Sequence, residues 1–274
     1  MGSHAFPVDP RREDDGDRSA SVLVAVVKAR RPPSSGSSSA GKGPLRIMSI
    51  VLAGYGLIKK YGSTNALAGV DVEVGERDSL AIMGPSGSGK STLLHTLAGI
   101  IRPDGGQVLL RGERIDNLGE NRLSALRRKR FGFVFQSGQL LPELPAEENV
   151  ALPLMLEGVP RKQAVQRARR WFAPLGLAGL ERRRPGQLSG GQAQRVAIAR
   201  ALASEPDVVF ADEPTGALDQ TTSTEVIQLL TSVTREQGAA LVMVTHDADV
   251  AAHCGRILQV RDGRISSHGQ YTIA

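Results

Sequence analysis

Cysteine and aromatic residues are scarce in this sequence of 274 residues. Cys254 is the only cysteine, which excludes an intramolecular disulfide and a zinc site built from cysteine ligands. A reducing compartment is therefore compatible with the chain. Aromatic residues make up 4%, and no RNA-binding signature interleaves them with basic residues. The formal net charge of +6 thus does not by itself indicate nucleic acid, and we interpret the arginine runs at 127–130 and 182–184 as solvated faces.

Long hydrophobic runs are missing as well. The longest apolar run near the N-terminus covers residues 22–27, far short of the roughly 20 residues that a membrane-spanning helix needs. Basic residues at 11–12 precede this run, but acidic residues at 13–15 follow them directly, and this is not the layout of a signal peptide. We therefore expect that the chain does not cross a membrane by itself.

Residues 1–47 differ in composition from the rest of the chain. A cluster of mixed charge is followed by a segment rich in proline, serine and glycine at 32–44, which cannot bury enough apolar surface to become ordered. We predict that residues 1–47 are a disordered extension and that residues 48–270 form one nucleotide-binding domain. Met48 is a candidate for the natural start, a hypothesis that mass spectrometry of the native protein would test.

Residues 84–92, GPSGSGKST, match the pattern G-x-x-x-x-G-K-[ST] of a phosphate-binding loop. Glycines allow backbone N–H groups to approach phosphate oxygens. An apolar strand at 80–83 and an apolar helix at 91–98 are expected on either side, so the N-terminus of the helix would face the anion. This context disfavours the alternative of a chance glycine- and serine-rich turn. The predicted nucleotide-binding residues are Gly84, Pro85, Ser86, Gly87, Ser88, Gly89, Lys90, Ser91 and Thr92, with Lys90 at the β- and γ-phosphates and Ser91 on Mg²⁺.

The pattern of apolar residues predicts an α/β fold. Alternation over residues 50–74 and a short strand at 105–112 predict an antiparallel sheet. Strands at 207–211 and 240–245, separated by a helix at 221–234, predict a parallel sheet that is covered on both sides. Prolines punctuate helical runs over residues 137–200, which predicts a helical insertion. Its leucines at 140, 141 and 144, together with the apolar run from Leu152 to Leu156, either pack the insertion's own core or form a groove for a partner's helix, and the sequence leaves both open.

Two further motifs place polar residues at the ends of expected elements. Asp212 and Glu213 follow the strand at 207–211, at the strand end where open α/β sheets bind ligands. Asp212 would hold Mg²⁺, and Glu213 would act as the general base toward water. LSGGQ at residues 188–192 opens a helix over 193–202, whose N-terminus would form a second anion site. Two such sites indicate either two nucleotides or one nucleotide held by two protomers.

Taken together, these motifs resemble the ATPase subunit of an ATP-binding cassette (ABC) transporter. The resemblance is carried by residues 84–92, Gln136, LSGGQ followed by QRVAIARAL, FADEPTGALD at 210–219, and His246, and it covers residues 49–265. The sequence of these motifs is most similar to the branch that serves lipoprotein-release, macrolide-export and cell-division-type permeases. The resemblance implies a P-loop NTPase (RecA-like) α/β core with a parallel sheet, an N-terminal antiparallel β subdomain and an inserted α-helical subdomain.

The resemblance also assigns roles to individual residues. Tyr61 would stack on adenine, Gln136 would touch Mg²⁺ or the attacking water, and His246 would contact the γ-phosphate. The residues that would bind the ATP held by the opposite protomer are Ser189, Gly190, Gly191 and Gln192. Asp219 would link the two sites across the dimer, with an ordinary helix N-cap as the alternative. The remaining histidines, which show no metal-ligand pattern and are interpreted as surface or packing residues, are His4, His95, His253 and His268.

The resemblance implies a cytoplasmic ATPase, peripheral on the inner face of the cell membrane. It would bind and hydrolyse Mg-ATP in a head-to-tail homodimer and drive a separate integral membrane permease, with no specific nucleic acid bound. The alternative is a soluble ABC-type ATPase that acts on nucleic acid or ribosomes. Such proteins usually carry a second cassette or a long coiled coil, and neither pattern is present here. A P-loop kinase would leave LSGGQ unexplained.

Overall fold

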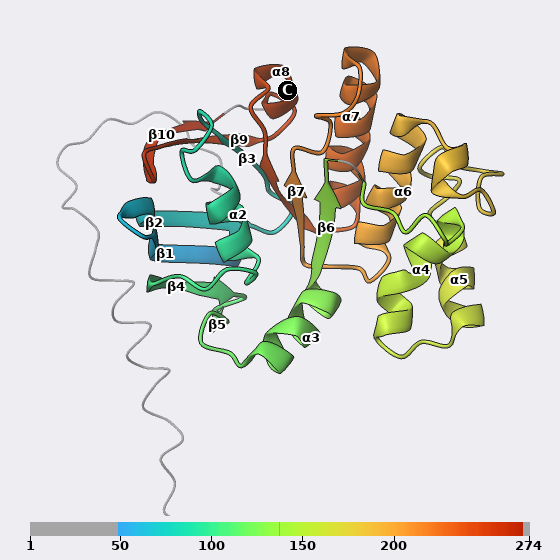
Figure 1. Ribbon diagram of the computed structural model, residues 1–274, viewed down its shortest axis with the longest axis horizontal. Helices are drawn as coiled ribbons and strands as arrows, with labels where there is room; N and C mark the ends of the chain where they lie inside the picture. The colour runs from blue at the N-terminus through green and yellow to red at the C-terminus, as the bar shows by residue number, and fades with distance from the viewer. Residues whose placement is uncertain (1–48, 137, 271–274) are drawn as a thin grey trace, which may run out of the picture. The chain divides into compact units, whose positions relative to one another are not determined.

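The computed structural model describes residues 49–136 and 138–270 (Figure 1). The prediction for residues 1–47 lies outside these residues, as does His4. The side chain of His268 is likewise outside what the structure describes.

A four-stranded antiparallel sheet occupies the N-terminal part of the described chain, in the order β2-β1-β4-β5. Its strands are β1 (Ile50–Tyr61), β2 (Thr64–Gly75), β4 (Gly105–Leu110) and β5 (Glu113–Arg114). β1 and β2 form a hairpin that turns directly after Tyr61. The alternating pattern over residues 50–74 therefore corresponds to two paired strands, and the predicted antiparallel sheet is confirmed.

A second, six-stranded sheet has the order β10-β9-β3-β8-β7-β6. Its strands are β3 (Ser79–Met83), β6 (Phe131–Phe135), β7 (Val208–Asp212), β8 (Ala240–Val244), β9 (Arg256–Arg261) and β10 (Arg264–Gln270). Every neighbouring pair is parallel except the β9–β10 hairpin. The predicted parallel sheet is thus present, and the hairpin at its edge is an addition that the apolar pattern did not indicate.

The described helices lie on both faces of this second sheet and, in the insertion, beside it (Figure 1). They are α2 (Lys90–Leu97), α3 (Glu120–Arg130), α4 (Ala146–Leu156), α5 (Arg161–Arg169), α6 (Gly190–Leu202), α7 (Gln220–Glu236) and the single turn α8 (Ala248–Ala251), with a 3-10 turn η1 (Pro185–Gln187) before α6. None of the helices within residues 49–136 and 138–270 is long and apolar enough to span a bilayer.

Two buried cores lie on the two faces of the parallel sheet, because successive side chains of a strand point to opposite faces. In β7, Val208 and Phe210 join the core around α2, which also packs against the antiparallel sheet. Val209 and Ala211 join the core around α6 and α7. The helix that follows the phosphate-binding loop is therefore fixed between the two sheets.

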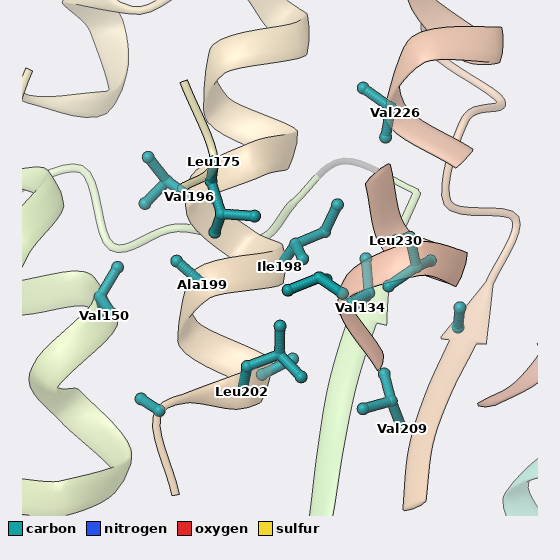
Figure 2. Close-up of a cluster of buried hydrophobic side chains, with 14 of the residues drawn as sticks. Val134, Val150, Leu175, Val196, Ile198, Ala199, Leu202, Val209, Val226 and Leu230 are labelled. Atoms are coloured by element: carbon teal, nitrogen blue, oxygen red, sulfur yellow. The ribbon is translucent and has the colours of Figure 1, made fainter. Parts of the chain in front are cut away.

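The helical insertion shares this second core with the sheet. Val150 of α4, Val196 of α6 and Val134 of β6 belong to one buried cluster, and Figure 2 shows α6 lying between Val150 on one side and Val134 on the other. Leu154 is buried in the same cluster at 5% exposure, whereas Leu141 and Leu156 are exposed at 42% and 62%. The leucines of the insertion thus divide between core and surface.

Candidate active site

The loop between β3 and α2 has a backbone that only glycine allows at two positions. Gly84 and Gly89 have φ angles of 150° and 103°. A Cβ atom on Gly84 would lie 2.0 Å from the carbonyl oxygen of Val260, and one on Gly89 would lie 2.2 Å from that of Ala66. Gly89 also gives α2 an N-cap without a side-chain hydrogen bond, so the first N–H groups of the helix have no side-chain cap and are oriented toward an anion.

Residues 84–92 form a phosphate-binding cradle, to which side chains of the loop also contribute. Lys90 folds back so that its Nζ donates to the carbonyl oxygen of Pro85 at 2.9 Å. Ser88 Oγ is buried and has no hydrogen-bond partner among the described residues. A phosphate would offer acceptor oxygens in place of the single carbonyl that Lys90 now contacts.

A cavity of about 540 Å³ lies beside the cradle, at the carboxyl end of β7. It is lined by Ser91, Phe135, Gln136, Gln139, Asp212, Glu213 and Ala217. Ser91 Oγ lies 3.4 Å from Asp212 Oδ1. Burial raises the pKa of Asp212, and the nearby His95 and Ser91 oppose that shift only in part. The structure therefore brings together three of the predicted residues, Ser91, Gln136 and Asp212, that carry oxygen donors for a metal.

Glu213 is held in an unusual conformation at this cavity. Its φ angle is 47°, a left-handed conformation that costs a non-glycine residue about 1–3 kcal/mol. Its N–H donates to the carbonyl oxygen of Val244, the last residue of β8, at 3.0 Å. Its Oε1 lies 2.9 Å from Nδ1 of His246, which follows β8. His246 thus contacts the predicted general base, and its own side chain is 73% exposed.

The N-terminus of α6 is capped by its own motif. Ser189 Oγ accepts the N–H of Gln192 at 3.2 Å, and Gln192 Oε1 accepts the N–H of Ser189 at 3.0 Å. Ser189 and Gly190 are exposed, and neither is among the described residues that line the cavity. The structure therefore does not bring these residues to the cavity of their own chain.

Asp219 forms the N-cap of α7. Its Oδ1 accepts the N–H of Thr222 at 3.0 Å, and hydrogen bonds to Thr222 lower the pKa of its carboxyl group. The contact observed for Asp219 is thus the ordinary helix N-cap that was the alternative prediction for this residue. A Cβ atom on Gly191 would lie 2.6 Å from Thr222 Cγ2, so the start of α6 packs directly against the start of α7.

A family model described as ABC transporter matches residues 67–216, a range that contains the cradle, Gln136, the start of α6 and most of the Asp212 motif. The chain belongs to the ABC transporter family.

Relatives of this ABC ATPase are similar over nearly all of the described chain. The lipoprotein-releasing system ATP-binding protein LolD of Geobacter metallireducens is 45% identical over 222 residues, which is 80% of this chain and 99% of that protein. The macrolide export ATP-binding/permease protein MacB of Nitrosomonas europaea is 44% identical over 215 residues, which is 77% of this chain and 32% of that protein. A dimeric post-hydrolysis structure of the ATP-binding cassette MJ0796 with ADP and Pi is 37% identical, with a TM-score of 0.73, and covers 81% of this chain and all of that one.

These similarities confirm several of the predictions. The P-loop NTPase fold, the resemblance to the lipoprotein-release and macrolide-export branch, and the function of an ABC transporter ATP-binding subunit with ATPase activity are all confirmed. The same findings favour this function over a soluble ATPase that acts on nucleic acid or ribosomes. The roles of individual site residues remain predictions.

Two residues near the site were not recognised in the sequence of this ABC ATPase. His95, interpreted as a surface or packing residue, has its Nε2 3.8 Å from Asp212 Oδ2. It lies one helical turn after Ser91, a spacing that places both side chains on one face of α2. Gly216 lies against Gln136, because a Cβ atom there would be 2.7 Å from Gln136 Nε2.

The structure also places Tyr61, which is predicted to stack on adenine. Its side chain is 52% exposed at the end of β1.

Proposed function

We propose that the chain binds Mg-ATP at residues 84–92 and hydrolyses it in a head-to-tail homodimer that drives a separate integral membrane permease. The observation that carries the catalytic part is the convergence of Ser91, Gln136, Asp212 and Glu213 on one cavity beside the cradle. The described residues contain no group of three or more His, Cys, Asp or Glu side chains placed to hold a metal. This is consistent with Mg²⁺, which is usually held by one or two protein oxygens together with substrate phosphates.

Each residue around the cavity would have a separate role in hydrolysis. Ser91 and Asp212 would hold Mg²⁺, which neutralises phosphate charge when bound. Lys90 would bind the β- and γ-phosphates, and Gln136 would touch Mg²⁺ or orient the attacking water. Glu213 would accept the proton of that water, and its contact with His246 keeps the carboxylate in place. The protein thus contributes positioning, charge and one proton acceptor.

Replacement of Glu213 with Gln tests the catalytic assignment. The amide keeps the size of the side chain but cannot accept the proton, so turnover should fall by a factor on the order of 10²–10⁴. The Kd for ATP, measured by equilibrium binding, should stay close to the wild-type value because the cradle lies on other residues. Near wild-type turnover in this variant would show that Glu213 is not the base.

The head-to-tail dimer is supported by the position of the α6 N-terminus. Ser189 and Gly190 do not reach the cavity of their own chain, yet they are exposed at the start of a helix whose dipole favours an anion. The MJ0796 cassette is described as dimeric with ADP and Pi. Variants Lys90→Ala and Ser189→Arg should each be inactive alone. A mixed dimer would place both substitutions in one site and leave the other site intact, so each mixed dimer should regain up to about half of the wild-type activity if the sites act independently.

Coupling between the two sites would suppress that recovery. A crosslink between protomers is therefore the control. Cysteines at Ser86 and Ser189, in a Cys254→Ser background, should crosslink between protomers only when ATP is present. If neither recovery nor the crosslink is observed, the two-protomer site is wrong.

The permease partner and a place on the inner face of the cell membrane are proposed from LolD, a subunit of a lipoprotein-releasing system, and from MacB, an ATP-binding/permease protein.

A further inference from the structure

Arg200, in the last turn of α6, contacts the backbone of the turn at Gly138 and Gln139 beside the cavity. Its Nη1 donates to the carbonyl oxygen of Gln139 and its Nη2 to that of Gly138, both at 2.7 Å. Gln139 is one of the residues that line the cavity together with Gln136, Asp212 and Glu213. The guanidinium of a residue on α6 therefore holds the two successive carbonyl groups of Gly138 and Gln139, shortly after Gln136 in the chain.

This segment has a conformation that needs support. Gly138 and Gln139 have φ angles of 68° and 45°, and the left-handed conformation costs about 1–3 kcal/mol at a residue such as Gln139. Both carbonyl groups of this turn converge on one cation, which compensates for the strain with two charge-assisted hydrogen bonds. The turn is thus fixed by a side chain that is more than sixty residues away in the sequence.

The charge on Arg200 is not explained by an ion pair. The guanidinium is half-buried, and burial lowers its pKa, yet it forms no salt bridge with any carboxylate in the described part of the chain. Gln194, also on α6, already ties the helix to β6 by donating to the carbonyl oxygen of Phe135 at 3.0 Å. If anchoring of α6 were the only requirement, a neutral side chain would avoid the cost of burying a charge.

We infer that Arg200 is a positioning residue, which holds the Gly138–Gln139 turn in place so that α6 and the Gln136 wall of the cavity move as one unit. Because Ser189 is the N-cap of α6, the same helix carries the residues proposed to bind the partner's ATP at one end and the support of the cavity wall at the other. The inference rests on the proposed catalytic role of this cavity. It provides a physical route by which a displacement of α6 changes the position of Gln136.

The test compares Arg200→Gln and Arg200→Lys with the control Arg195→Gln in the full chain. Arg195 lies on the same helix but pairs with Glu225 on α7 at 2.7 Å. The amides of Gly138 and Leu141 are both hydrogen-bonded, so hydrogen–deuterium exchange at these two sites reports opening of the turn.

We expect Arg200→Gln to exchange faster at both amides and to lower kcat about tenfold, with the Kd for ATP unchanged within about twofold, because small misplacement of a catalytic group lowers turnover more than binding. Arg200→Lys, which keeps the charge but lacks the fork of donors, should be intermediate. Arg195→Gln should resemble the wild type in all three measurements.

Unchanged exchange and kcat in Arg200→Gln would overturn the inference. So would a parallel loss of ATP binding and turnover, or a failure of both Arg200 variants to fold, since each would assign Arg200 a general structural role. If the wild-type chain itself shows no ATPase activity, the proposed function fails, whereas the exchange comparison still decides whether Arg200 holds the turn.

Discussion

A single added methyl group at Gly216 should displace Gln136 without disturbing the fold. Gly216 lies in the loop after Asp212, and its φ angle is not in the left-handed region, so alanine fits its backbone without strain. The new Cβ atom would lie 2.7 Å from Nε2, 3.1 Å from Cδ and 3.3 Å from Cγ of Gln136. These separations are shorter than the 3.5–4.0 Å of an ordinary contact, so the Gln136 side chain has to move by about 1 Å.

The size of the effect follows from that displacement. Gln136 is exposed, so its side chain can swing away at a cost to the free energy of unfolding of within about 0.5 kcal/mol. A misplacement of about 1 Å in a catalytic group lowers the rate by up to about 100-fold. We therefore expect Gly216→Ala to keep its Tm and its Kd for ATP while kcat falls between about tenfold and 100-fold.

Steady-state ATPase assays of four variants would check this prediction. Gly186→Ala is the matched control, since a Cβ atom there would have no neighbour within 4 Å. Gln136→Ala should lose as much activity as Gly216→Ala, and the double variant should lose no more than either, because both changes remove the same positioned amide. Full activity in Gly216→Ala, or losses that multiply in the double variant, would refute the reasoning.

Three further predictions concern residues outside the cavity. Tyr61→Ala should raise the Kd for ATP about tenfold through loss of base stacking, with no change in Tm because the side chain is half exposed; an unchanged Kd would contradict the stacking role. Leu141→Asp and Leu156→Asp should abolish co-purification with a permease from detergent-solubilised membranes and spare basal ATPase activity, whereas the buried control Leu154→Asp should lower Tm; loss of folding in the first two would favour a role in the core. Burial, with a smaller contribution from Asp78, raises the pKa of Cys254 to about 12, so iodoacetamide at pH 8 should label the thiol only after unfolding, and labelling of the native chain would show that the thiol is accessible.

The parts of the fold that could be predicted from the sequence are those set by local pattern. The antiparallel strands over residues 50–74 and strand β8 were predicted because alternation and short apolar runs depend only on neighbouring residues. Helix α3 was not, since Leu123 is its only fully buried residue and its arginines were interpreted as a solvated face. In the structure residues 128–130 are exposed, whereas Arg127 is half-buried and donates to the carbonyl oxygen of Gly99 at 2.6 Å; Arg130 also pairs with Asp207.

The parts of the site that escaped prediction are contacts between distant residues. The approach of His95 to Asp212 and that of Gly216 to Gln136 depend on how β6, β7 and α2 are placed by the two cores. A glycine in the Asp212 motif and a histidine one turn after Ser91 are visible in the sequence, but neither pattern predicts which residue the glycine or the histidine contacts. Motifs therefore predict the chemistry of the groups, whereas tertiary packing decides which groups meet.

Strain in the cavity wall shows how packing and chemistry are connected in this protein. Gln139 and Glu213 both line the cavity and both have left-handed backbones, which together cost roughly 2–6 kcal/mol. Neither conformation would persist in an isolated loop. Glu213 is held by its N–H bond to Val244 of β8, and Gln139 is held by Arg200 of α6. The wall that would orient water is therefore held by β8, which ends shortly before His246, and by α6, which Ser189 caps. Movement of either element would thus shift the groups proposed to orient water.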